Sequence, residues 1–165
     1  AYRLQSEAIA LTPEDNDLVY DQAMLAEKTG RLDEMETLLR QVIARQPDYH
    51  HAYNALGYSF ADRGVRLEEA KRLIQKALEF AAEDPFITDS LAWVEFRLGN
   101  KAEAARLLRF AFAKKPDSEI AAHLGEVLWS QGNTSEAKAI WQEGLRLNPN
   151  NSTLKGTLKR LGVSL

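Results

Sequence analysis

The chain has 165 residues, of which 45% are hydrophobic and 27% are charged, proportions that are ordinary for a globular protein. Its 21 basic and 24 acidic residues give a net charge of −3, and the pI of 5.7 provides no electrostatic reason to bind nucleic acid. The absence of cysteine excludes disulfides, thiol nucleophiles and thiolate metal sites. No apolar run approaches the roughly 18 residues of a membrane-spanning helix.

The most prominent feature of the sequence is an internal period near 34 residues. Turns that contain glycine recur with spacings of 34, 35 and 33 residues, at Gly30, Gly64, Gly99 and Gly132. Prolines close several units, at Pro13, Pro47, Pro116 and Pro149. Apolar residues between these points follow helical spacing, and no segment shows the alternation of a strand. The pattern therefore predicts two helices in each unit, the first ending at the glycine and the second ending near the proline.

The unit that begins at His50 shows the repeat pattern most fully. It carries Tyr53, Leu56-Gly57, Phe60, Gly64 and, after one inserted residue, Ala70, Ile74 and Ala77. This pattern resembles the tetratricopeptide repeat (TPR), and the unit that begins at Asn16 matches it least. The resemblance implies an all-α solenoid in which helix-turn-helix units stack into a right-handed superhelix.

The TPR resemblance divides the chain into a half-repeat, four repeats and a cap. Residues 1–15 are expected to form the second helix of a truncated preceding repeat, because running the period backwards places Ala1 inside a helix; we therefore expect a piece of a longer protein. The four repeats are expected at 16–49, 50–84, 85–117 and 118–151. A capping helix is expected over 152–165. Its apolar side would carry Leu154, Leu158 and Leu161, and its water-facing side Lys155, Lys159 and Arg160.

Three stretches support a closer resemblance: residues 51–58, 89–99 and 119–129, together with the later Asn148-Pro149-Asn150. Over about residues 50–162 the chain is similar to the C-terminal TPR region of proteobacterial outer-membrane TPR lipoproteins, including pseudomonad members that bind a periplasmic carboxy-terminal processing protease. This resemblance implies an adaptor at the periplasmic face of the outer membrane that brings cell-wall hydrolases to the protease. Its lipid anchor would lie outside this sequence. A cytoplasmic location is the alternative.

The TPR resemblance also implies which side chains face the inner wall of the solenoid, because fixed positions of each first helix form that wall. Among them are the candidate partner-binding residues Tyr20, His51, Asn54, Tyr58, Phe86, Asp89, Trp93, Phe96, Arg97, Glu126 and Trp129. Further wall positions hold Met24, Glu27, Asp62 and Glu119. An aromatic-lined groove is a typical recognition surface for an extended segment or a helix, with Trp and Tyr as frequent anchors. Packing of these rings between neighbouring first helices is the alternative.

One family of chaperone-binding TPRs grips a carboxylate with basic residues on this wall. The equivalent positions here hold Tyr20, Asn54, Asp89 and Ala122. None of these side chains is basic, so a clamp for a C-terminal carboxylate is not expected.

Several other residues invite a structural interpretation. His123 and Glu126 share a helix face at a spacing that metal sites use, but further ligands are lacking. We therefore expect His123 to form hydrogen bonds, with Asp89 as a candidate partner.

Trp141 occupies a core position between the two helices of its repeat. Glu95 stands where an aromatic core residue is usual, and either reaches the rim or marks a local irregularity. A solvated outer face is expected for the basic residues Arg106, Arg109, Lys114 and Lys115, and a site for a weak anionic partner is the alternative.

The function expected from these features is protein–protein recognition without catalysis. The sequence contains no G-x-G-x-x-G, no G-x-x-x-x-G-K-[ST] and no H-E-x-x-H, and we expect no cofactor and no metal. The expected partners are other proteins, in the form of a peptide or helix ligand; nucleic acid and direct membrane contact are not expected. Two alternatives remain open: a self-assembly module that forms homo-oligomers, and an accessory domain of a larger enzyme.

Overall fold

The computed structural model describes residues 15–165, and all regular structure in this range is α-helical. The helices are α2 (Asn16–Lys28), α3 (Leu32–Arg45), α4 (His50–Arg63), α5 (Leu67–Phe80), α6 (Pro85–Arg97), α7 (Lys101–Lys114), α8 (Ser118–Ser130), α9 (Thr134–Leu147) and α10 (Ser152–Leu161). This order confirms the expected all-α helical repeat fold. Apart from Asp15, the half-repeat expected over 1–15 lies outside the described residues.

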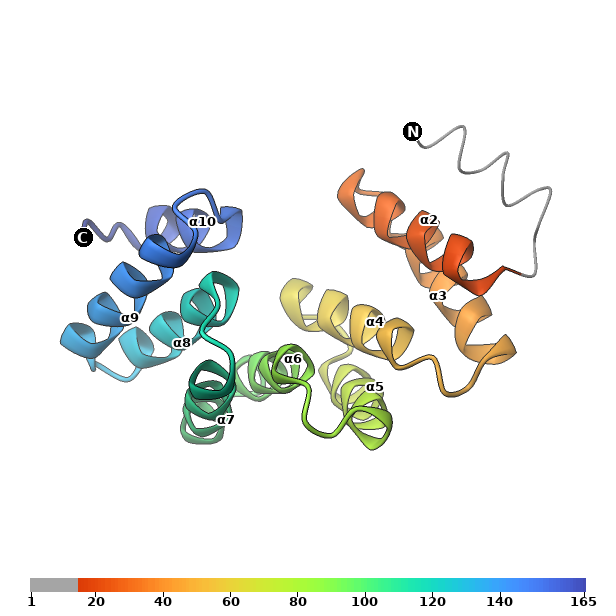
Figure 1. Cartoon of the computed structure of the whole chain (residues 1–165), viewed down its shortest axis with the longest axis horizontal. Helices are drawn as coiled ribbons and strands as arrows, with labels where there is room; N and C mark the ends of the chain where they lie inside the picture. Colours follow the sequence, from red (N-terminus) through yellow and green to blue (C-terminus); the bar gives the residue numbers. More distant parts are fainter. Residues whose placement is uncertain (1–14) are drawn as a thin grey trace.

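The helices follow one another in pairs around an arc, with α2 and α10 near its two ends (Figure 1). The pairs α2–α3, α4–α5, α6–α7 and α8–α9 pack most extensively, and each pair then packs against the next. The first helices also contact one another directly, α4 with α6 and α6 with α8, and α10 continues this series by packing on α8. Among residues 15–165, no helix combines the length and apolarity needed to cross a membrane.

Aspartates fix the starting points of three first helices. Asp15, Asp84 and Asp117 precede α2, α6 and α8, and the side chain of each accepts hydrogen bonds from two backbone N–H groups of the first turn. Such caps satisfy N–H groups that have no partner within the helix. Pro85 then occupies the first turn of α6, where its missing N–H costs nothing.

The glycine turns end the first helices as the sequence predicts. Gly64 caps α4 with φ of 68°, a left-handed conformation that side chains with a Cβ rarely adopt. The guanidinium of Arg97 lies against this turn, so a Cβ at Gly64 would also meet Arg97 at 2.5 Å. The turn after α4 contains the inserted residue, and Arg66 takes a left-handed φ of 47° there.

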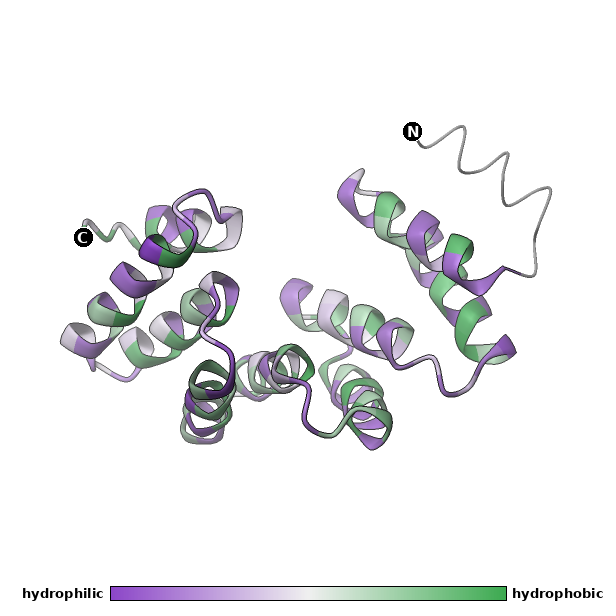
Figure 2. Cartoon of the chain, in the orientation of Figure 1, coloured by the Kyte–Doolittle hydropathy of each residue, from purple (hydrophilic) through white to green (hydrophobic). Residues whose placement is uncertain are grey.

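Each helix has an apolar stripe that faces its neighbours, and Figure 2 shows hydrophobic and hydrophilic residues alternating around the helices. The predicted core position of Trp141 is confirmed: the side chain is 0% exposed, and its Nε1 donates to the carbonyl of Ala122 at 3.2 Å. The ring lies over Gly125 of α8, where an added Cβ would come within 2.2 Å of Nε1. A glycine at this position therefore lets α8 and α9 approach closely.

The structure settles two of the other expectations. Glu95 does not reach the rim, because it is only 6% exposed; its carboxylate accepts from Lys71 Nζ at 2.7 Å and from Asn100 Nδ2 at 2.6 Å. The basic residues of α7 form the expected solvated face. Three of them pair with acidic neighbours: Arg106 with Glu103, Arg109 with Glu136 and Lys114 with Glu83.

Candidate binding groove

Two adjoining hollows lie where the first helices face one another. The N-terminal hollow has a volume of about 420 Å³ and is lined from α2, α4, α6 and α8 by Tyr20, Met24, Glu27, Asn54, Ala55, Tyr58, Phe86, Asp89, Ser90 and Glu119. The C-terminal hollow has a volume of about 250 Å³ and is lined from α4, α6, α8 and α10 by Tyr58, Asp62, Trp93, His123, Glu126, Ser152, Thr153, Gly156, Thr157 and Arg160. Tyr58 lines both, and we call the two hollows together the groove.

A chain of three polar side chains links three helices beneath the groove. Nδ1 of His123 on α8 lies 2.9 and 3.0 Å from the two carboxylate oxygens of Asp89 on α6, which confirms the predicted hydrogen bond. Nε2 of His123 lies 3.2 Å from the hydroxyl of Tyr58 on α4. The indole of Trp93 stacks on the imidazole with 4.4 Å between ring centroids. The buried imidazole thus has a partner on each nitrogen and on one face.

The protonation of His123 depends on its surroundings. Burial by itself would lower the pKa of His123, but Asp89, with Glu119 and Glu126 on its own helix, raises it above the usual 6.5. A protonated imidazole donates from Nδ1 to Asp89 and from Nε2 to the Tyr58 oxygen, so both N–H groups have acceptors. Burial also raises the pKa of Tyr58, which keeps this phenol neutral.

This arrangement predicts that the fold is more stable at mildly acidic than at mildly alkaline pH. The unfolded chain releases the His123 proton near pH 6.5, whereas the folded chain holds it to higher pH. The stabilisation is therefore complete below pH 6.5 and is lost as the pH rises through the folded-state pKa. Urea unfolding across this range should show a falling free energy of unfolding.

The His123→Gln variant should lose this part of the pH dependence. His51→Gln provides the control: burial lowers the pKa of His51, the opposite direction, so this variant should keep the fall in stability with rising pH that comes from His123. A pH profile that is identical in His123→Gln and the parent protein contradicts the assignment.

Of the candidate partner-binding residues, seven line the groove: Tyr20, Asn54, Tyr58, Phe86, Asp89, Trp93 and Glu126. Their accessibility differs greatly. Phe86 is 44% exposed and presents its ring to solvent, whereas Trp93 is 4% exposed because it packs against His123 and against Phe96, 5.3 Å away. Trp93 therefore lies at the floor of the groove and does not project into it as an anchor.

The other four candidates, His51, Phe96, Arg97 and Trp129, do not line either hollow. His51 lies 6.3 Å from Tyr20, centroid to centroid, towards the N-terminal end of α4. Trp129 lies 5.7 Å from Trp141, and Arg97 lies against the Gly64 turn. Trp129 thus packs against a ring of α9, and Phe96 packs against the hydrophobic core beside Trp93 of its own helix.

Helix α10 contributes a side of the groove that the sequence interpretation missed. Arg160 faces water as expected, with 56% of its side chain exposed, but its guanidinium also reaches Glu126 on α8, 2.6 Å away. Thr153, Gly156 and Arg160 follow the wall residues Glu119, Ala122 and Glu126 by one period of 34 residues. Extending the repeat into the cap would have predicted that these positions face the groove.

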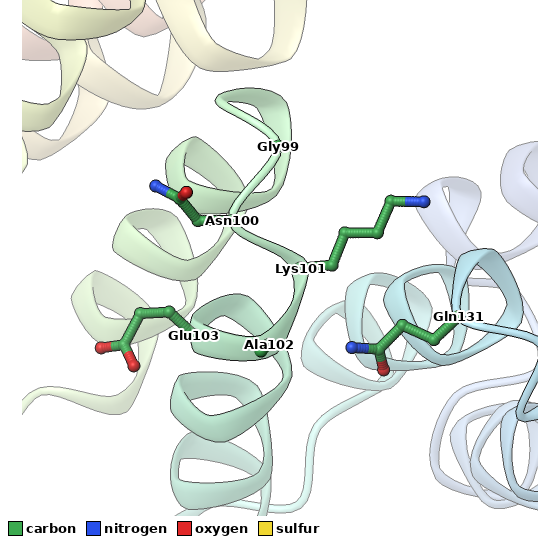
Figure 3. A pocket seen from close by; sticks show the side chains of 6 residues that line it. All are labelled: Gly99, Asn100, Lys101, Ala102, Glu103 and Gln131. Atoms are coloured by element: carbon green, nitrogen blue, oxygen red, sulfur yellow. The ribbon is translucent and has the colours of Figure 1, made fainter.

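A further hollow lies at the turn between α6 and α7 and has a different character. It is lined by Gly99, Asn100, Lys101, Ala102, Glu103 and Gln131. Lys101 extends towards the turn that carries Gln131, while Asn100 and Glu103 point the other way (Figure 3). Lys101 Nζ donates to the carbonyl of Ser130 at 3.1 Å. A similar hollow follows the next glycine turn, at residues 132–136, so this is a feature of the repeated turn and not a second candidate site.

A family model described as tetratricopeptide repeat matches residues 20–85 and 90–152. The chain belongs to the tetratricopeptide repeat family. TPR proteins generally mediate protein–protein interaction and are typically non-catalytic.

Relatives and solved structures agree with this membership. Over 126 residues the chain is 49% identical to TPR repeat-containing protein PA4667 of Pseudomonas aeruginosa, covering 76% of this chain and 21% of that protein. It is 26% identical to human protein O-mannosyl-transferase TMTC1, covering 98% of this chain and 19% of that protein. The chain therefore spans about a fifth of the length of these curated relatives.

Two crystal structures show the same fold. The thermophilic TPR protein TTC0263 of Thermus thermophilus superposes with a TM-score of 0.85 at 23% identity, over 98% of this chain and 89% of that one. YrrB, described as a TPR protein with an unusual peptide-binding site, superposes with a TM-score of 0.67 at 20% identity, over 98% of this chain and 86% of that one.

Proposed function

We propose that this chain is a scaffold or adaptor that binds a peptide segment or helix of another protein in the groove. The observation that carries the proposal is a pair of adjoining hollows whose walls come from successive first helices and α10. A surface of this kind offers several contact points in a row to an elongated ligand. Exposed Phe86 supplies an apolar anchor, and anchors of this type dominate the energetics of small interfaces.

We further propose that the partners are a periplasmic carboxy-terminal processing protease and the cell-wall hydrolases it acts on. The support is the resemblance of residues 50–162 to outer-membrane TPR lipoproteins and the 49% identity with a pseudomonad TPR protein. On this proposal the chain works at the periplasmic face of the outer membrane, as part of a longer protein that carries the lipid anchor.

The test is photocrosslinking from the groove. A photoreactive phenylalanine analogue is placed at Phe86 in one protein and at Phe110 in another; Phe110 is a matched control because it is 53% exposed on α7, outside the groove. After irradiation in a bacterial envelope extract, mass spectrometry identifies the adducts. We expect a defined partner from position 86 that is absent from position 110.

Phe86→Ala should weaken retention of the same partner about tenfold or more, since a buried hot-spot ring contributes about 2 kcal/mol or more. Phe110→Ala should have no effect. Equal adducts from both positions, or equal retention by both variants, would overturn the groove as the binding surface. Trp93→Ala is a poorer choice, because truncating this buried ring also opens the core.

A further inference from the structure

The N-terminal hollow has an unbalanced charge. Three carboxylates, those of Glu27, Asp89 and Glu119, line it, and none of its lining residues is basic. His123 pairs with Asp89 from below, but Glu27 and Glu119 have no ion-pair partner anywhere in residues 15–165. In the neighbouring C-terminal hollow, by contrast, Glu126 pairs with Arg160.

The two unpaired carboxylates are held in an unfavourable setting. Burial raises the pKa of Glu27 and the nearby Asp62 raises it further, whereas the charges of Arg63 and Lys28 act in the opposite direction without forming an ion pair. Burial likewise raises the pKa of Glu119; the charge of Asp89 adds to this shift, and the charge of His123 and a hydrogen bond from Thr153 oppose it. A cation placed in the hollow would stabilise both ionised carboxylates.

The remaining wall of the hollow suits a side chain that only donates hydrogen bonds. Asn54 also lines the hollow, and its Oδ1 is buried without a donor among the described residues. The rings of Tyr20, Tyr58 and Phe86 surround the same space. Aromatic faces attract cations, and the exposed ring of Phe86 could also cover the aliphatic stem of a long basic side chain.

We infer that the N-terminal hollow receives an arginine or lysine side chain of the bound segment. This inference rests on the proposed function and names the chemistry that the groove selects. Basic side chains are donors without acceptors, which matches a wall that combines two carboxylates without an ion-pair partner and several aromatic faces. The specificity is opposite to that of TPRs that grip a carboxylate with basic wall residues.

The test is selection from a library of random short peptides against this chain. We expect the enriched peptides to share a basic residue at a fixed position. The affinity of one selected peptide is then measured by calorimetry against the same peptide with citrulline in place of arginine, or norleucine in place of lysine. The neutral peptide should bind about tenfold or more weakly, as expected for the loss of a charge-assisted hydrogen bond.

Glu27→Gln/Glu119→Gln should bind the basic and neutral peptides with equal affinity. This variant should fold normally, because each substitution removes a carboxylate that the fold disfavours. Glu83→Gln/Glu143→Gln carries the same charge change on exposed sites and should keep the preference for the basic peptide.

Two outcomes would overturn the inference in distinguishable ways. Enrichment of neutral or acidic peptides that Phe86→Ala no longer binds would overturn the basic specificity and leave the peptide-binding function standing. Two results would overturn both the basic specificity and the peptide-binding function. One is no enrichment; the other is enriched peptides whose affinity is the same for the parent protein, Phe86→Ala and Glu27→Gln/Glu119→Gln.

Discussion

Replacement of Asp89 by alanine is expected to lower the free energy of unfolding by about 3–5 kcal/mol, the usual cost of removing one partner from a buried ion pair. Asp89 is 5% exposed and His123 1% exposed, so water does not replace the lost carboxylate. The cost should be largest below pH 6.5, where the unfolded chain binds the proton that the buried imidazole can no longer hold. Chemical denaturation at several pH values measures it.

A second background shows whether the cost comes from the pair. In a His123→Leu protein, Asp89 is a buried carboxylate without its counterion, so Asp89→Ala should there be neutral or stabilising. The exposed Asp21 provides the control, since Asp21→Ala should change stability by less than about 0.5 kcal/mol. An equal loss from Asp89→Ala in both backgrounds contradicts the proposed pairing.

The second large effect is expected from Trp141→Ala, which should cost about 3–5 kcal/mol. This ring is fully buried between α8 and α9, and its hydrogen bond to the Ala122 carbonyl is lost with it. Thermal and denaturant unfolding of the variant measure the loss.

Gly125→Ala tests the fit between the two helices from the other side. A Cβ at Gly125 would meet the indole at 2.2 Å, so this change should cost about 1–3 kcal/mol in the parent protein. In the Trp141→Ala background the same change should cost nothing, because the ring is gone. Gly156→Ala on α10 is the matched control: nothing lies within 4 Å of an added Cβ, and alanine favours the helix by up to about 1 kcal/mol. If the double variant loses as much free energy of unfolding as the two single variants together, the proposed contact between the Trp141 ring and Gly125 is contradicted.

The fold could be predicted because its determinants are local and periodic. The glycine turns, the prolines and the apolar spacing state where each helix ends, and Trp141 could be placed in the core from its repeat position alone. The charge on Glu95 could not be interpreted in this way. Its partners Lys71 and Asn100 belong to the preceding helix and the following turn, and a repeat pattern contains no information about which polar residues meet between neighbouring units.

The sequence predicts which residues line the groove, but it does not predict how exposed each of their side chains is. Repeat positions identify Tyr58, Phe86 and Trp93 as wall residues equally, yet Phe86 is 44% exposed and Trp93 is 4% exposed. The difference arises because His123 stacks on Trp93 from the next first helix. The bond between Tyr58 and His123 was also not predicted, because these residues are 65 positions apart in the sequence and meet only once the solenoid has curved.

That bond has a consequence for the mechanics of the whole arc. In a solenoid each unit ordinarily touches only the next, so bending accumulates joint by joint and units can detach from an end in turn. Here α4 and α8, two units apart, are joined by Tyr58 and His123 across α6, as a chord joins two points of an arch. This added contact opposes opening of the arc between the second and fourth units, with the roughly 1 kcal/mol that a single hydrogen bond contributes.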